Sequence, residues 1–309
     1  MKILVTGACG FVGGHLVARL VKAGHSLVAA IQNPAAVFDA SVQKTSFELI
    51  CPDEVRSAVQ AAHPDVIIHL AAQSMVVKSW EDPVGTVQVN TLGTLHLLNA
   101  LREMPDTLLV TIGSSDEYGL TGQLGKPLTE DQPCQPQNPY AVSKFAAGQL
   151  AMQISRKHRL HAVHLRPFNH FGPGQRAGYV VSDFCSQIAR IEKGELAPEI
   201  VVGDLTAQRD FTDVRDVIEA YALIAEQGLQ TGVYNICSGQ PRRVEDILNF
   251  LLRQSKLKIK VKVDPERLRP SDVPFFVGSA TKLKASINWE LRRDFHMSLC
   301  ETLDWWRKN

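Results

Sequence analysis

Short apolar runs alternate with segments of helical periodicity through the first half of the chain. The run Lys2–Thr6 predicts a buried strand, and the apolar spacing over Phe11–Ala23 predicts a helix that ends at Gly24. The same two patterns recur as far as Arg166. They predict strands over Ser26–Ile31, Asp65–Leu70, Thr107–Gly113 and His161–Arg166, and helices over about Asp53–His63, Val84–Arg102 and Pro139–His158.

Strands that alternate with helices pair in parallel through right-handed crossovers. We therefore predict an α/β protein in which residues 1–166 form a doubly wound, parallel Rossmann sheet, with ligands at the carboxyl ends of its strands. Beyond Arg166 the pattern loosens around Pro167 and Gly172–Gly174. We expect residues 167–309 to form mainly a smaller, C-terminal substrate-binding region, with residues about 205–237 rejoining the sheet. Helices are predicted there over Val181–Lys193, Val214–Glu226 and Val244–Arg253.

The composition is that of a globular protein and narrows the choice of partners. Of the 309 residues 45% are apolar, and Lys plus Arg exceed Asp plus Glu by 33 − 32 = 1. So small a net charge gives no reason to expect nucleic acid or a membrane surface as partner, and no run approaches the roughly 20 apolar residues of a membrane span. The six cysteines form no CxxC pair and the ten histidines show no metal-ligand spacing. We expect a cytoplasmic protein without a bound metal.

A glycine motif, TGACGFVG at residues 6–13, lies between the first predicted strand and the first predicted helix. Gly7 permits the tight turn, Gly10 lets the backbone approach a pyrophosphate, and Gly13 lets helix and strand pack closely. The helix N-terminus supplies amide donors and partial positive charge. A glycine triplet alone could be a structural turn, but its place between strand and helix favours a dinucleotide site.

The end of the second predicted strand bears on the choice of dinucleotide. NAD-specific sites usually carry an acid there, which bonds the ribose hydroxyls. Here Ile31 is followed by Gln32 and Asn33, so no acid repels a 2′-phosphate and no arginine attracts one. The sequence favours NADP(H), with NAD(H) as the alternative.

Tyr140 and Lys144 stand four positions apart after the helix start signals Asn138 and Pro139, so they share one helix face. A phenol with a pKa of about 10 exchanges protons poorly near neutrality. We expect the Lys144 ammonium and an oxidised nicotinamide to lower the pKa of Tyr140. Tyr140 would then protonate a carbonyl oxygen as hydride reaches carbon, and Lys144 would also bond the nicotinamide ribose.

A YxxxK pattern alone is also typical of a surface tyrosine beside a solvated lysine. Here it follows the sequence GSSDEYG, which spans residues 113–119 at the end of an apolar strand. Ser114 in that sequence can bond the same carbonyl oxygen. The presence of Ser114, Tyr140 and Lys144 in this order after the glycine motif favours the catalytic interpretation.

With these features the sequence resembles the extended short-chain dehydrogenases/reductases over nearly the whole chain. The motifs that carry the resemblance are HLAAQSM at 69–75, SWEDP at 79–83, NTLGT at 90–94, RPFNHFGP at 166–173, RDFTDV at 209–214 and YNICSG at 234–239. Within that family, Gln73-Ser74, FNHFGPGQ at 168–175 and RLRPSDV at 267–273 are similar to the branch that acts on GDP-mannose derivatives.

The resemblance implies NAD(P)H-dependent reduction of the 4-keto group of GDP-4-keto-6-deoxy-D-mannose to GDP-D-rhamnose. The catalytic residues would be Ser114, Tyr140 and Lys144. Cofactor contacts are expected at Gly7, Gly10, Phe11, Val12, Gly13, Gln32, Asn33, Glu48, Leu49, Leu70, Ala71, Ala72, Tyr140, Lys144 and Phe168. Substrate contacts are expected at Ser74, Ser114, Asp116, Glu117, Asn169, Arg190, Arg209 and Arg269.

Arginines suit the diphosphate because their planar donors bind bidentately. By resemblance, Arg209 and Arg269 contact the diphosphate or ribose, and Arg190 is a weaker candidate. A surface ion pair is the alternative for each of them, and Arg209 is followed directly by Asp210. Asn169 would bond a sugar hydroxyl or the pyrophosphate, or else cap its loop. The family also implies a homodimer formed through the helix that carries Tyr140.

A 4,6-dehydratase or 4-epimerase of the same family is the alternative activity. Dehydratases carry Thr-x-Glu before Tyr-Gly, with the glutamate as base. Aligned on Tyr118-Gly119, this chain has Ser114 and Asp116 at those positions. Aspartate is one methylene shorter, and a misplacement of about 1 Å can cost on the order of a hundredfold in rate, so reduction is favoured. For Asp116 and Glu117, bonding to sugar hydroxyls or capping of the loop is favoured over proton transfer.

A regulator that binds NAD(P) without catalysis is the alternative from another class. Such proteins commonly lack part of the Ser/Tyr/Lys set, and this chain keeps all of it. An enzyme is therefore favoured.

Overall fold

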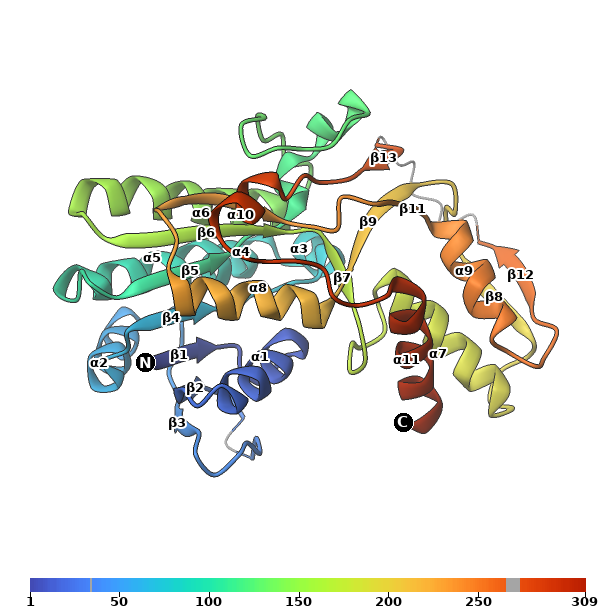
Figure 1. Ribbon diagram of the computed structural model, residues 1–309, viewed down its shortest axis with the longest axis horizontal. Helices are drawn as coiled ribbons and strands as arrows, with labels where there is room; N and C mark the ends of the chain where they lie inside the picture. The colour runs from blue at the N-terminus through green and yellow to red at the C-terminus, as the bar shows by residue number, and fades with distance from the viewer. Residues whose placement is uncertain (34, 265–272) are drawn as a thin grey trace.

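The computed structural model describes residues 1–33, 35–264 and 273–309. Its larger part is a seven-stranded sheet with the order β10-β6-β5-β4-β1-β2-β3 (Figure 1). Every neighbouring pair in this sheet is parallel, which confirms the predicted doubly wound Rossmann fold. The strands are β1 (Lys2–Thr6), β2 (Ser26–Ala30), β3 (Gln43–Thr45), β4 (Val66–His69), β5 (Leu108–Ile112), β6 (His161–Pro167) and β10 (Gly232–Ile236).

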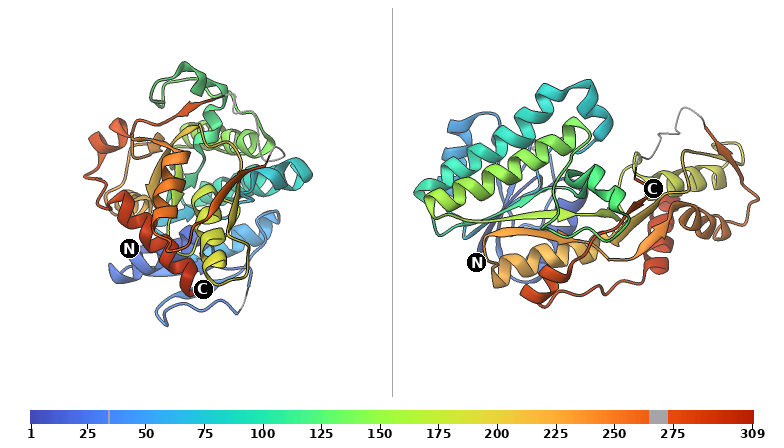
Figure 2. Two further views of the ribbon diagram at one scale, coloured as in Figure 1. Left: turned by 90° about the vertical axis from the view of Figure 1, so that its right-hand side faces the viewer. Right: turned by 90° about the horizontal axis from the view of Figure 1, so that it is seen from above.

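Helices cover both faces of this sheet. Figure 2 shows α5 and α6 side by side on one face and α8 on the other. The first layer consists of α2 (Pro52–Ala62), α5 (Gly93–Ala100) and α6 (Pro139–His158), and the second of α1 (Phe11–Lys22) and α8 (Val214–Gln227). Except for α5, these bounds agree with the predicted helices to within a few residues.

Each face of the sheet has its own hydrophobic core. Because side chains alternate along a strand, Ile3 and Val5 of β1 pack toward α1 and α8, whereas Leu4 packs toward α2 and α5. A strand buried on both faces has no polar side, and this explains the continuous apolar runs in the sequence.

The strand order reverses between β1 and β4. From β1 the chain adds β2 and β3 on one side, then returns to place β4 on the other. Thr6 at the end of β1 is in register with His69 at the end of β4. In doubly wound sheets the crevice at such a switch point binds the ligand, so the fold places a site beyond these two residues.

The smaller part of the molecule has its own core, which includes Phe171, Phe184, Leu248 and Leu299. β9 pairs with β7 and β13 in parallel and with β11 antiparallel, while β8 pairs with β12. The strands are β7 (Asn169–Phe171), β8 (Glu199–Val202), β9 (Gln208–Asp213), β11 (Pro241–Arg243), β12 (Lys260–Val263) and β13 (Phe275–Phe276). The helices are α7 (Val180–Glu192), α9 (Val244–Arg253) and α11 (Phe295–Lys308). Within residues 205–237, α8 and β10 lie with the large sheet, whereas β9 lies in this smaller part.

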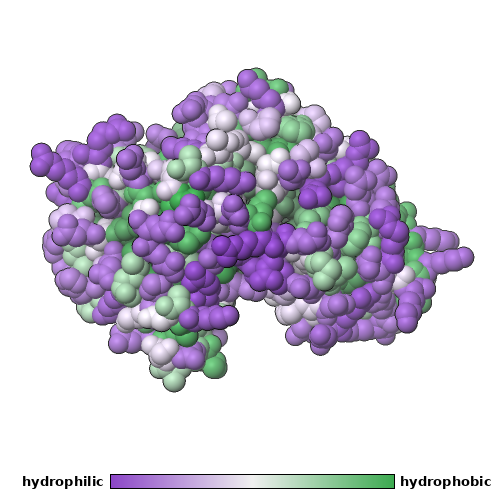
Figure 3. All heavy atoms as spheres, in the orientation of Figure 1, coloured by the Kyte–Doolittle hydropathy of each residue, from purple (hydrophilic) through white to green (hydrophobic). Residues whose placement is uncertain are grey.

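Side chains connect the two parts of the molecule. Figure 3 shows an indentation between the part that holds α1 and the part that holds α11, with polar side chains over most of this face. His15 of α1 bonds to the carbonyl oxygen of Pro173 at 2.8 Å. Arg215 at the start of α8 forms an ion pair with Glu301 of α11. Over the described ranges, no helix has both the length and the apolar character to cross a bilayer.

The helix predicted over Val84–Arg102 is interrupted. It consists of α4 (Pro83–Val87), a π-helical turn η1 (Gln88–Leu92), α5 and a short 3-10 turn η2 (Leu101–Glu103). The turn places Asn90 in the interior, where its amide donates to the carbonyl oxygen of Gln73 at 3.0 Å and to Ser143 Oγ at 2.9 Å. The second bond links this segment to α6, and hydrophobic periodicity cannot show either bond. Two further short helices, α3 (Val76–Glu81) and α10 (Thr281–Ser286), complete the fold with the 3-10 turns η3 (Ser115–Tyr118) and η4 (Leu120–Leu124).

The close packing of α1 on the turn after β1 predicts opposite effects of alanine on stability at two neighbouring glycines. A Cβ on Gly13 would lie 2.7 Å from the carbonyl oxygen of Ala8 and closer still to that of Gly7, whereas a Cβ on Gly14 would meet nothing within 4 Å. Gly13→Ala should lower the free energy of unfolding by about 1–3 kcal/mol through overpacking. Gly14→Ala should raise it by about 0.5–1 kcal/mol, because alanine favours the helix. Chemical denaturation of both variants measures the difference, and equal stabilities would contradict the packing described.

Candidate active site

The glycine motif forms the turn between β1 and α1. Gly7 has a φ of 68°, and a Cβ there would lie 2.7 Å from the backbone nitrogen of Ala71 in the loop after β4. α1 begins after Gly10 without a side chain that caps its first amides. A glycine cradle against an uncapped helix N-terminus at the switch point fits the pyrophosphate of a dinucleotide.

Two predicted cofactor segments follow the strand ends beside this cradle. Leu70, Ala71 and Ala72 come directly after β4, where Thr6 Oγ1 accepts a hydrogen bond from the Ala71 amide at 3.1 Å. The same hydroxyl lies 2.7 Å from His69 Nδ1. These bonds hold the ends of β1 and β4 together beneath the cradle.

The remaining cofactor predictions are distributed around the end of the sheet. Gln32 and Asn33 are exposed directly after β2, with no acid between them and the strand. Glu48 is exposed in the loop after β3, and the carbonyl oxygen of Leu49 bonds to a ring nitrogen of His96. Phe11 and Val12 begin α1, and the Phe11 ring stacks on that of His170 with an interplanar angle of 5°.

Phe168 lies differently from the expectation. Its side chain is 2% exposed and packs against Tyr118 and Phe276, and its backbone amide donates to Ile236. The ring therefore belongs to the core under the site, and a cofactor contact by this side chain has no support. The sequence motif could not show that the ring turns inward.

The three predicted catalytic residues come together at the end of β5. Tyr140 lies in the first turn of α6, which Asn138 caps by accepting from the Ala141 amide at 2.8 Å. One turn later, Lys144 is buried and its Nζ donates to the carbonyl oxygen of Ile112 at 2.8 Å. Ser114 follows β5, close enough to Tyr140 for its hydroxyl to lower the pKa of that phenol. β5 and α6 thus bring the three side chains together.

Burial determines the proton affinities of this set. It raises the pKa of Tyr140, the charge of Asp116 adds to this, and the hydrogen bond from Ser114 acts against it. We expected the Lys144 ammonium to lower the pKa of Tyr140, and in the protein alone burial outweighs any such effect. Burial also lowers the pKa of Lys144 to about 8, while the charge of Glu117 raises it. The protonated phenol is therefore stable near neutrality, and this is the form that donates a proton during reduction.

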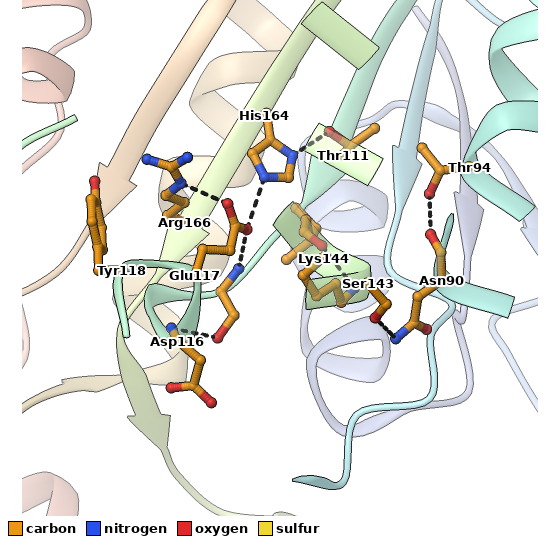
Figure 4. Close-up of polar contacts among 12 residues, drawn as sticks. Asn90, Thr94, Thr111, Asp116, Glu117, Tyr118, Ser143, Lys144, His164 and Arg166 are labelled. Carbon is orange, nitrogen blue, oxygen red and sulfur yellow. Dashed lines mark hydrogen bonds and ion pairs between the residues drawn. The ribbon is translucent and has the colours of Figure 1, made fainter. Parts of the chain in front are cut away.

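The turn after Ser114 is fixed by a capping box. Ser114 Oγ accepts from the Asp116 amide at 3.1 Å, and the Glu117 carboxylate accepts from the Ser114 amide at 2.9 Å. Glu117 is fully buried and points toward His164 and Arg166 of β6 (Figure 4). Its place corresponds to the loop-capping alternative and leaves it no access to a sugar hydroxyl.

Asp116 and Arg209 face each other from the two parts of the molecule. Burial raises the pKa of Asp116, and the charge of Arg209 acts in the opposite direction. Asp204 and Asp116 are the acids whose charges act on Arg209, whereas Asp210 accepts from the amides of Ser238 and Gly239 and Asp213 pairs with Arg215. Arg209 Nη1 also donates to the carbonyl oxygen of Gln208 at 2.9 Å, and a substrate contact at Arg209 stays a prediction.

Ser74 and Asn169 lie on the exposed border of the site. Ser74 Oγ is 3.2 Å from the hydroxyl of Tyr179, and the Tyr179 phenol affects the pKa of Tyr140. Asn169 is exposed and its amide donates to the carbonyl oxygen of Asp210 at 3.1 Å. Both side chains are thus accessible, and Tyr179 belongs with them although the sequence analysis did not single it out.

Arg190 does not join this group. Arg190 lies near the end of α7, about 15 Å along the helix from its start at 1.5 Å per residue. It is exposed and pairs with Glu195 at 3.2 Å, so the surface ion pair describes it better than a substrate contact. Arg269 lies outside the described residues. Over the described residues, no group of three or more His, Cys, Asp or Glu is arranged to hold a metal ion.

Comparison with known proteins places this site in a family. The family described as GDP-mannose 4,6 dehydratase matches residues 4–302. The chain is 36% identical to GDP-6-deoxy-D-mannose reductase of Pseudomonas aeruginosa over 99% of this chain and 97% of that protein. It is 29% identical to GDP-6-deoxy-D-talose 4-dehydrogenase of Aggregatibacter actinomycetemcomitans over 92% of this chain and 90% of that protein.

Solved structures agree with the sequence relatives. The structure of RMD from Pseudomonas aeruginosa complexed with NADPH is similar with a TM-score of 0.88 and 34% identity, over 99% of both chains. UDP-glucose 4-epimerase of Thermus thermophilus in complex with NAD is similar with a TM-score of 0.88 and 29% identity, also over 99% of both chains. The predicted fold and family are confirmed: the chain belongs to the GDP-mannose 4,6-dehydratase family of extended short-chain dehydrogenases/reductases.

Proposed function

We propose that this protein reduces the 4-keto group of GDP-4-keto-6-deoxy-D-mannose with NAD(P)H and releases GDP-D-rhamnose. The observation that carries the proposal is the convergence of Ser114, Tyr140 and Lys144 at the end of β5, beside the glycine cradle. The reductase from Pseudomonas aeruginosa, similar over nearly all of both chains, supports the substrate. We assign the cofactor mainly to residues 1–166 and the nucleotide-sugar mainly to residues 167–309.

Reduction requires a hydride at the carbonyl carbon and a proton at its oxygen. A bound reduced nicotinamide supplies the hydride. Tyr140 donates the proton, since its raised pKa keeps the phenol protonated near neutral pH. Ser114 bonds the same oxygen and holds it at the phenol. The Lys144 ammonium stabilises the phenolate that remains after transfer.

NADP(H) is the proposed cofactor, with NAD(H) as the alternative. A carboxylate at the end of β2 would repel the 2′-phosphate, and Gln32 and Asn33 stand there instead. The relative from Pseudomonas aeruginosa was solved with NADPH, which supports this choice, while the epimerase from Thermus thermophilus was solved with NAD.

Dehydration and epimerisation are the alternatives within the family. Both return the hydride to the sugar, and dehydration also needs a base for the C5 proton. The shorter Asp116 stands where dehydratases carry glutamate, with its charge offset by Arg209. This disfavours dehydration. Reduction from the other face of the ketone would give 6-deoxy-D-talose, and the talose dehydrogenase relative keeps that product open.

The proposed reaction predicts a fixed stoichiometry. Incubation with GDP-4-keto-6-deoxymannose and NADPH should consume one cofactor per ketone, measured at 340 nm, because the hydride leaves with the product. NMR of the sugar should identify rhamnose. Conversion of GDP-mannose without a net change at 340 nm would point to the dehydratase or epimerase instead. A talose product would change the stereochemical assignment alone.

The substitution Tyr140→Phe tests proton transfer separately from cofactor binding. The variant lacks the proton donor, so ketone reduction should fall by at least about a hundredfold. NADPH affinity, followed by fluorescence titration, should stay near the wild-type value because Lys144 and the glycine cradle are intact. Wild-type turnover in this variant would remove the proposed mechanism.

We also propose a cytoplasmic homodimer. Exposed apolar side chains gather on α3, α4, η1 and α6, elements that pack on one another: Val77, Trp80, Val84, Val87, Leu92 and Val142. Apolar side chains concentrated on one surface favour a protein partner, and a second copy fits the family expectation. The small residues Ala147, Gly148 and Ala151 of α6 are buried within the protomer. The interface would therefore use the opposite face of α6, around Val142.

A charge on this surface should separate the protomers. Val142 is 47% exposed, and Val142→Glu should shift the sedimentation coefficient from dimer to monomer, because a carboxylate would be buried without a partner. Leu257→Glu, at a comparably exposed apolar position beyond α9, should leave the dimer intact. A wild-type monomer, or a Val142→Glu dimer, would exclude this interface.

A further inference from the structure

Glu117 is a buried acid whose two oxygens are both occupied. Oε1 accepts from the Ser114 amide at 2.9 Å and lies 3.0 Å from His164 Nε2, and Oε2 accepts from Arg166 Nε at 2.8 Å (Figure 4). The side chains of Glu117, His164 and Arg166 are at most 4% exposed. Although burial opposes ionisation, His164 and Arg166 hold the pKa of Glu117 below its ordinary value. The group is therefore a carboxylate at neutral pH.

Burying these charged groups is unfavourable for the free energy of folding. Removing ions from water costs several kcal/mol each, and apolar side chains of similar volume often stabilise a protein equally well. Arg166 also lies 4.8 Å from the centre of the Tyr118 ring, so the group extends through the core behind the site. A role beyond stability would account for charges at this position.

The contacts of Glu117 lead directly to the catalytic residues. Ile112, Gly113 and Ser114 are consecutive. The first receives the hydrogen bond from Lys144, and the last carries the hydroxyl that acts on the pKa of Tyr140. The Gly113 amide is tied to Leu165 of β6 at 2.7 Å. Glu117 fixes the other end of this segment through the Ser114 amide. One short piece of backbone therefore sets the positions of both Ser114 and the partner of Lys144.

Two glycines leave room for this group. A Cβ on Gly113 would collide with Glu117 and His164, and a Cβ on Gly148 would collide with the same His164 ring. Gly148 lies one turn beyond Lys144 on α6, so the ring of His164 fills the space between the end of β5 and the catalytic helix. His164 Nδ1 is 2.9 Å from Thr111 Oγ1, which fixes the ring from its other side.

We propose that Glu117 is a positioning residue for the reduction: its carboxylate holds Ser114 at the ketone oxygen and keeps a negative charge near Lys144. This inference rests on the proposed function and adds a residue to it that does not touch the substrate.

The charges around Lys144 support the second half of this role. Burial lowers the pKa of Lys144, and the charge of Glu117 raises it toward its ordinary value. His69 of β4 also faces Lys144, but burial and the ammonium lower the pKa of His69 to about 3, so it is neutral. Tyr140, one turn earlier on α6, is protonated near neutrality. Glu117 is thus the facing group that helps Lys144 to stay charged.

Two substitutions separate the hydrogen bond from the charge. Glu117→Gln keeps the shape but loses the charge and places an amide group against donors of Ser114, His164 or Arg166. Glu117→Asp keeps the charge, so it should fold even if Glu117→Gln does not, but it is one methylene too short to hold all three partners. Glu130→Gln is the matched control, since Glu130 accepts from the Asn235 amide on the far side of Tyr118, away from Ser114.

In both Glu117 variants kcat should fall about tenfold or more, because small displacements of reacting groups are costly, while KM for the nucleotide-sugar changes little. Reduction needs Lys144 charged, so activity falls as pH rises through its pKa. Glu117→Gln lowers that pKa and should move the alkaline limb of the kcat profile to lower pH, whereas Glu117→Asp should leave the limb near the wild-type position. Glu130→Gln should match the wild type in kcat and in pH profile.

Hydrogen exchange at the Ser114 amide tests the positioning without any substrate. Exchange should be faster in both Glu117 variants and unchanged in Glu130→Gln. Wild-type exchange at Ser114, or wild-type kcat and pH profile in both Glu117 variants, would overturn the inference. If the wild-type protein fails to reduce the ketone, the proposed function fails, and exchange still decides whether Glu117 holds Ser114.

Discussion

The hydrogen bond from the buried Lys144 ammonium to the carbonyl oxygen of Ile112 fixes the catalytic helix over the end of β5. An ammonium out of water must have partners, so α6 cannot slide along the sheet without losing this one. Because Tyr140 lies one turn earlier on the same face, the bond also fixes the phenol beside Ser114. The site therefore takes its geometry from the parallel sheet, whose neighbouring strands end at one edge.

Around this bond, charged side chains lie where different secondary-structure elements meet. Glu117 of η3 meets Arg166 and His164 of β6, and Asp116 faces Arg209 of β9. The first group is inaccessible and acts on the protein itself, whereas Asp116 is only partly buried. Two adjacent acids thus have different surroundings because the 3-10 turn points Glu117 inward and leaves Asp116 partly exposed.

Structural features that depend on repeating or local patterns could be predicted from the sequence. Strands such as β4 and β5 are buried on both faces and therefore appear as apolar runs, and the four-residue spacing of Tyr140 and Lys144 is a property of any helix. The short strands β3, β11 and β12 escaped prediction because they are polar and owe their conformation to partners far away in the chain. The inward turn of Phe168, the place of Tyr179 and the raised pKa of Tyr140 depend in the same way on tertiary contacts, which no linear pattern contains.

The central claim is that Ser114 and Tyr140 converge on a sugar carbonyl next to a hydride donor. A crystal structure of the complex with NADP⁺ and the reduced GDP-sugar measures this directly. We expect the sugar C4 oxygen within about 3 Å of both hydroxyls, with C4 facing the nicotinamide and the diphosphate at Arg209. A sugar bound with C4 away from Tyr140, or a nicotinamide on the other side of α6, would contradict it.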